Sequence, residues 1–160
     1  MAAVRGSWLV SQGIVKRWRD RNLDQTFRDE WGDDTNAYKA LHDEEARPSP
    51  PGPYCVYDVA EPVVKNHQTG HTTSEEIQTQ EVGIQFRIHA KSTGSESGKS
   101  ICIRLAKAVR AAFDNPARFV ALPDTHVETI NEPDFHTREG DEEWVLAVPY
   151  TLTVDAAYNV

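Results

Sequence analysis

The chain has 160 residues, 17 Lys and Arg against 25 Asp and Glu, a net charge of −8 and 39% hydrophobic residues. Its length and composition predict one soluble, intracellular domain over 1–160, because two separate cores would each be small for independent stability. No run approaches the ~20 apolar residues that span a bilayer, and the first residues lack the basic start and apolar stretch of a signal peptide.

The first predicted element is a helix over residues 7–21, with Ser7 as its N-cap. Its apolar face repeats at helical spacing, at Trp8, Ser11, Val15 and Trp18. The basic segment 16–21 suits a helix C-terminus. Because a Trp is interleaved with the cations, this segment also fits phosphate contact, and a nucleic-acid-binding module stays open as an alternative.

Residues 22–53 are weakly patterned and are predicted to form an irregular, Pro-rich connector. Four prolines lie between Pro48 and Pro53, and such a run fits neither a helix nor a paired strand. The connector leads into 54–59, whose aromatic and β-branched residues predict a strand.

The clearest strand covers residues 82–90, where apolar residues alternate with others, at Val82, Ile84, Phe86, Ile88 and Ala90. Upstream, 77–80 extends this strand but is polar on nearly every side, and 66–71 is rich in turn residues. We therefore expect a β-hairpin that projects past the core.

A second helix is predicted over 99–114. One side is apolar, at Ile101, Leu105, Ala108, Val109, Ala112 and Phe113. The other side is basic, at Lys99, Arg104, Lys107 and Arg110. Pro116 ends the helix, because the residue before a proline is pushed out of helical geometry.

Two further strands complete the prediction, one near 126–130 and one over 144–154, with an acidic turn at 131–141 between them. Pro149 lacks the amide donor of a ladder bond, so the last strand is expected at or near a sheet edge. The order α-β-β-α-β-β predicts an α+β fold, an antiparallel sheet of about four strands with two helices packed on one face.

The charge is unevenly distributed along the chain. Residues 91–118 carry six basic and two acidic groups, whereas 119–160 carry one basic and nine acidic groups. A cationic stretch beside an anionic one suits complementary faces that meet between copies, and it equally suits two separately solvated surfaces.

Residues 94–100, Gly-Ser-Glu-Ser-Gly-Lys-Ser, follow a strand and open a helix, as a phosphate-binding loop does. The Walker A pattern needs four residues between its glycines, whereas three stand here. The segment is therefore interpreted as a polar loop that leads into a capped helix.

No other motif indicates catalysis. Short groups of metal-ligating residue types at 67–71, 124–128 and 134–136 do not by themselves supply the three convergent ligands of a metal centre. Cys55 and Cys102 lie in strand-like and helix-like runs, so both are predicted to be buried, reduced thiols. We predict no catalytic residue, no metal and no cofactor.

Several short elements follow one another in an order that characterises a known family. They are 53–56, 83–86, 90–92, 113–114 and 150–154. In this order the chain resembles the tail terminator, or tail completion, proteins of long-tailed bacteriophages. That family has a Pro-Tyr-Val strand, a Val-Gln-Phe strand running into Ala-x-Ser, a helix ending in Phe-Asp and a closing Tyr-x-x-Thr-Val strand. The resemblance covers roughly residues 1–155, with Cys55 in place of the commoner Val and a longer segment at 24–52.

The resemblance implies a structural protein of the virion, in the tail and neck, that is assembled in the host cytoplasm. Such proteins form a ring, commonly a hexamer, that caps the tail tube, stops its elongation and joins it to the neck. The implied partners are other copies of this chain, the tail tube protein and a neck or connector protein. Genomic DNA would pass through the lumen without specific binding, which a like-charged wall allows. The family contributes no catalytic residues.

If the resemblance holds, two sets of residues form the subunit interface or line the lumen. The polar hairpin contributes Glu75, Glu76, Gln78 and Gln80. The basic helix face is expected to meet the acidic turn of the next copy, through Arg104, Lys107, Arg110, Glu139, Asp141, Glu142 and Glu143. The alternatives are a neck or head–tail connector protein, a small phosphate- or metal-dependent enzyme, and the nucleic-acid-binding module.

Overall fold

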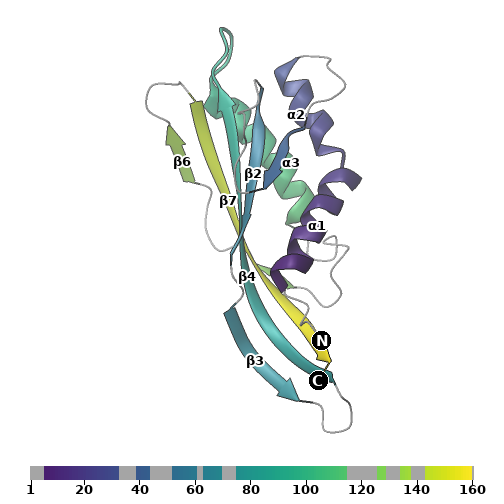
Figure 1. Ribbon diagram of the computed structural model, residues 1–160. Helices are drawn as coiled ribbons and strands as arrows, with labels where there is room; N and C mark the ends of the chain where they lie inside the picture. Colours follow the sequence, from purple (N-terminus) through teal and green to yellow (C-terminus); the bar gives the residue numbers. More distant parts are fainter. Residues whose placement is uncertain are drawn as a thin grey trace.

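The computed structural model describes the backbone of residues 6–32, 39–43, 52–60, 63–69, 75–114, 126–128, 134–137 and 143–159. These residues form an α+β fold in which three helices lie on one face of a mixed sheet (Figure 1). The predicted α+β class is therefore confirmed. No helix in this part of the chain is both long and apolar enough to cross a membrane.

The helices are α1 (Gly6–Asp20), α2 (Leu23–Trp31) and α3 (Gly98–Phe113). α1 and α3 confirm the two predicted helices, whereas α2 lies where an irregular connector was expected. The details of the first prediction are wrong in two places, because α1 begins at Gly6, before the predicted N-cap Ser7, and because Val15 is exposed while Val10 and Ile14 are buried. The chain turns between α1 and α2 at Asn22, whose φ of 51° is left-handed, a conformation that Asn tolerates. Only Leu23 and Phe27 are buried in α2, so its apolar repeat is too short to stand out among its charged residues.

The strands are β1 (Leu41–Asp43), β2 (Tyr54–Val59), β3 (Val63–Thr69), β4 (Glu75–Lys91), β5 (His126–Glu128), β6 (Asp134–Thr137) and β7 (Glu143–Asn159). The sheet runs in the order β1-β2-β4-β7-β5, with β3 also on β4 and β6 also on β7. All these pairs are antiparallel except β1 with β2, so the prediction of an antiparallel sheet is wrong for β1. β1 has only three residues and no alternating apolar pattern of its own, so nothing in its sequence indicates this pairing.

Pro149 lies at a gap along the outer side of β7. β6 pairs with residues 144–147 and β5 with residues 151–153, so Pro149 falls between them while it faces Gln85 of β4 on its other side. Pro149 has no amide N–H to donate, and it lies where no described strand pairs with the side of β7 that faces away from β4. As predicted, β7 lies near an edge of the sheet.

The core lies between the helices and one face of the sheet. Phe86 is fully buried there, with its ring 4.8 Å from the ring of Phe113 and 6.0 Å from that of Tyr150. The predicted apolar faces of β4 and α3 are confirmed, because their side chains are buried at Val82, Ile84, Ile88, Ala90, Ile101, Leu105, Val109 and Ala112. Full burial of one large apolar side chain contributes about 1.5–3 kcal/mol.

The two long strands extend beyond the helical layer (Figure 1). β4 and β7 have 17 residues each and pair along their whole length, from Lys91 with Glu143 to Glu75 with Asn159. Seventeen residues of strand span about 55 Å, whereas a compact domain of this chain's length has a radius of gyration of about 15 Å. We call the projecting part, β3 with residues 75–81 of β4 and 153–159 of β7, the arm.

Candidate interface surfaces

The hairpin residues predicted to contact a neighbour or the lumen all lie in the arm. Glu75 and Glu76 begin β4 at the end remote from the helices, and Gln78 and Gln80 follow at alternate positions (Figure 1). All four pair with β7, and Glu76, Gln78 and Gln80 also pair with β3. The fold therefore places this set together on the central strand of the arm.

Arg104 of α3, predicted to meet another copy, is engaged in a network within the chain. Its Nε donates to Oε1 of Glu30 at 2.9 Å and its Nη2 to Oε2 of Glu30 at 2.7 Å, which is a bidentate pair. The same guanidinium also contacts both carboxylate oxygens of Glu96. Glu96 and then Glu30 raise the pKa of Arg104, and Arg104 lowers the pKa of Glu96. The network ties α3 to α2 and to the loop before α3.

Of the other two predicted interface cations, Arg110 forms an ion pair with a described residue and Lys107 does not. Arg110 pairs with Asp114 one turn later, at 3.3 Å. Lys107 is exposed and forms no ion pair with any residue that the structure describes. Two of the three basic side chains predicted to contact a neighbouring copy are thus already paired in their own chain.

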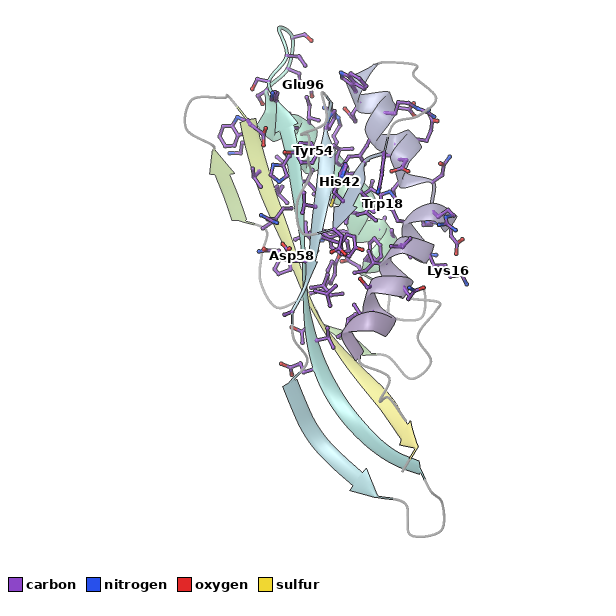
Figure 2. The ribbon with its side chains drawn as sticks, in the orientation of Figure 1. Lys16, Trp18, His42, Tyr54, Asp58 and Glu96 are labelled. Atoms are coloured by element: carbon purple, nitrogen blue, oxygen red, sulfur yellow. The ribbon has the colours of Figure 1, made fainter. Side chains whose placement is uncertain are left out.

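Glu143 differs from the prediction of an exposed acidic turn, because its side chain is buried. Its Oε1 lies 2.7 Å from Nδ1 of His89, with the two residues 3% and 7% exposed. The ring of Tyr54 stacks on His89 at 4.5 Å, and His42 meets Tyr54 edge-on (Figure 2). Buried polar side chains need such partners, so this cluster holds β1, β2, β4 and β7 together.

The sequence did not single out His89 or Tyr54. The one available signal is that His89 occupies a polar position in the alternation of β4. The three remaining acidic residues of the predicted turn, Glu139, Asp141 and Glu142, lie outside the described residues.

The segment that resembles a phosphate loop uses its backbone amides internally. The amide of Gly98 donates to Oγ of Ser92 at 2.9 Å, and the amide of Glu96 to Oγ1 of Thr93 at 3.1 Å. Ser97 caps α3 by accepting from the amide of Ser100 at 3.3 Å. The prediction of a polar loop that leads into a capped helix is therefore confirmed, and these amides are not available to a phosphate.

The described parts of the three groups considered as metal ligands lie in different strands, with 67–69 in β3 on β4 and the other two groups in β5 and β6. The segments in β5 and β6 pair with different parts of β7, 151–153 and 144–147. Within the described residues, no three His, Cys, Asp or Glu side chains converge on a common point.

Both cysteines are free and buried, as predicted. Burial raises the pKa of the Cys102 thiol to about 12 and that of Cys55 well above its ordinary value. Thiolates are the nucleophilic form, so we expect no reaction with a thiol-reactive disulfide reagent at pH 8 in the folded protein and two reacting thiols in guanidinium. Rapid reaction of the folded protein would contradict this prediction.

The same two thiols should make stability depend on pH. Because both folded pKa values lie above the ordinary 9.0, the free energy of unfolding should fall as the pH rises above 9.

The basic segment 16–21 is divided between the core and the surface. Arg17 is buried, and its Nε donates to the carbonyl of Ala112 in the last turn of α3 at 2.9 Å. Trp18 is buried too, and its Nε1 donates to Asp24 at 2.9 Å. Lys16 points away from the body of the protein (Figure 2).

Arg17→Ala is expected to lower the free energy of unfolding by about 1–3 kcal/mol, because it leaves a buried carbonyl at a helix end without its donor. Arg21→Ala, at an exposed position, should change it by about 0.5 kcal/mol or less. Urea unfolding of the two variants measures the difference. If Arg17→Ala changes the free energy of unfolding as little as Arg21→Ala does, the Arg17 side chain has no structural role.

Comparison of the sequence with protein-family models gives no match. Comparison with curated proteins gives no significant match either.

Proposed function

We propose that this protein is a structural subunit that assembles into a closed ring, which caps a phage tail tube, stops its elongation and joins it to the head or neck. The observation that carries the proposal is the arm. A small sheet of this kind needs a hydrophobic face or packing against another layer for stability, and no described helix lies over the arm (Figure 1). A neighbouring subunit can supply that layer.

The arm also has edges on which another chain can pair. Among the described strands, β3 pairs with β4 alone, and β7 has no second partner beyond Thr153. Unpaired strand edges are templates for a strand from another chain. Head-to-tail contacts made in this way close into a ring when the rotation per subunit suits it.

Four of the five segments that carry the resemblance to tail terminators meet at α3. Ser92 accepts from the first amide of α3 at 2.9 Å, and the hydroxyl of Tyr150 donates to Asp114 at the other end at 2.5 Å. Between them, Phe86 packs on Phe113. Elements far apart in the sequence thus hold both ends of one helix, which supports a shared architecture as the origin of the pattern.

In this proposal the partners are further copies of the chain, the tail tube protein and a neck or connector protein, all within the virion. The net charge of −8 disfavours attachment to phosphates, since cationic contacts are what give DNA its affinity for proteins. Genomic DNA can then pass through the lumen without being held.

Light scattering after size exclusion, followed by electron microscopy of the purified protein, tests the proposal. We expect one closed ring with a central hole, and six chains of 18.0 kDa give a mass of 108 kDa. A protein that stays at 18.0 kDa at every concentration contradicts it.

The alternative, a neck or head–tail connector protein, would also form a ring. Tail tube subunits polymerised in the presence of the protein distinguish the two. A terminator shortens the tubes and sits at one end of each, whereas a connector leaves their length unchanged.

A further inference from the structure

A pocket of about 370 Å³ opens between the end of α1 and the edge of the sheet at β1. Its apolar wall is formed by Val15, Trp18, Leu41 and Tyr57, and Arg19 and Lys39 lie at its rim. Val15 is 39% exposed, which is unusual among the large apolar side chains that the structure describes. β1 is the last strand on this side of the sheet, and no described strand pairs with its outer edge.

The free charge at the pocket is positive. The carboxylate of Asp24 accepts from Nε1 of Trp18 at 2.9 Å and from the amide of Ala40 at 3.0 Å. Burial and the neighbouring carboxylate of Asp43 raise the pKa of the Tyr57 hydroxyl. Asp24 is therefore engaged inside the chain, and Asp43 lies next to Tyr57.

The two cations are placed differently. Arg19 and Lys39 are exposed, and neither forms an ion pair with a residue in the described part of the chain. The pocket thus suits a partner that brings an extended backbone and negative charge.

The arm has that chemistry. Its three segments, 63–69, 75–81 and 153–159, carry one lysine and four carboxylates, a net charge of −3. Glu75 and Glu76 stand at its far end. The basic face of α3 is a weaker candidate for the same contact, because Arg104 and Arg110 are already paired.

We propose that the pocket between α1 and β1 receives the acidic end of the arm from a second copy of this chain. This inference rests on the proposed ring, and it names the surface that the arm contacts. The contact joins two different surfaces, so every copy offers one arm and one pocket, as a ring requires.

Reversal of charge on each side tests the contact. Arg19→Glu/Lys39→Glu and Glu75→Lys/Glu76→Lys are each expected to weaken assembly about tenfold or more, since like charges then face one another. An equimolar mixture of the two variants should assemble again, because each arm then meets a pocket of opposite charge in an even-numbered ring. A single chain with all four substitutions should assemble alone. Mass by light scattering gives the readout, and circular dichroism verifies the fold of each variant.

The control is Lys91→Glu, which reverses an exposed charge away from both the pocket and the basic face of α3 and should leave assembly unchanged. A zero-length reagent that couples carboxylates to amines should join Lys39 to Glu75 or Glu76. A mixture of isotope-labelled and unlabelled copies shows that this cross-link forms between chains. A cross-link from Lys39 to another acidic segment, or no rescue in the mixture, means that something else occupies the pocket and overturns the inference. If Arg19→Glu/Lys39→Glu still assembles into rings of the wild-type mass, the inference about the pocket is overturned, while the proposed function stands. A wild-type protein that never assembles overturns both.

Discussion

Removal of the arm is expected to abolish ring formation and to leave the body of the protein folded. In this variant Asn-Gly, a dipeptide that favours tight hairpins, replaces residues 62–81, which keeps the register of β2 with β4, and the chain ends after Thr153. Val82 and Leu152, both fully buried, are kept, so the core loses none of its large apolar side chains. We expect a monomeric mass by light scattering. A single cooperative thermal transition and the circular dichroism of a folded α+β protein should show that the body stays folded.

Two outcomes would contradict this expectation. A ring of unchanged stoichiometry without the arm would place the subunit contact elsewhere. A variant that fails to fold would mean that the arm belongs to the core. Lys91→Ala serves as the control, since it changes an exposed side chain at the end of β4 opposite the arm and should affect neither the mass nor the thermal transition.

Phe86→Ala is expected to lower the free energy of unfolding by about 3–5 kcal/mol. The Phe86 side chain is 0% exposed and lies between β4, α3 and β7, against the rings of Phe113 and Tyr150. Its truncation removes apolar burial and leaves a cavity at the junction of these three elements. Because the stability of a domain is typically about 5–15 kcal/mol, this loss reaches a large fraction of the total.

Urea unfolding of the variant and the wild type measures this loss. Gln85→Ala is the matched control, because Gln85 is the neighbouring residue on the exposed side of β4 and should change stability by about 0.5 kcal/mol or less. A loss below about 1 kcal/mol for Phe86→Ala would show that the core does not depend on this contact.

The elements that the sequence predicted are those with a long and regular apolar repeat. β4 alternates through five buried positions from Val82 to Ala90, and α3 repeats its apolar side over 16 residues. The missed elements lack such a repeat. α2 buries two side chains in nine residues, and β1 has three residues in all. A short element is stabilised mainly by what it packs against, so its own sequence carries little signal.

The candidate interface was predictable only as a set of charges. Arg104, Arg110 and Glu143 were identified from the sequence as charged residues, but the sequence does not contain their partners' positions. Arg104 meets Glu30 across 74 residues, and Glu143 meets His89 across 54. Such pairings depend on how helices and strands pack, so the structure alone shows that each of these side chains has a partner within the chain.

The sequence by itself determined the acidic net charge and the α+β class, because composition and side-chain periodicity act locally along the chain. It also located the polar segment that extends β4 beyond the core. The tertiary structure alone decided which cations remain free. It buries Arg17 beneath α3, pairs Arg104 with Glu30 and Glu96, and leaves Arg19 and Lys39 exposed beside a pocket. The net charge of −8 is a sum over the chain, whereas the charge available to a partner depends on contacts between residues far apart in it.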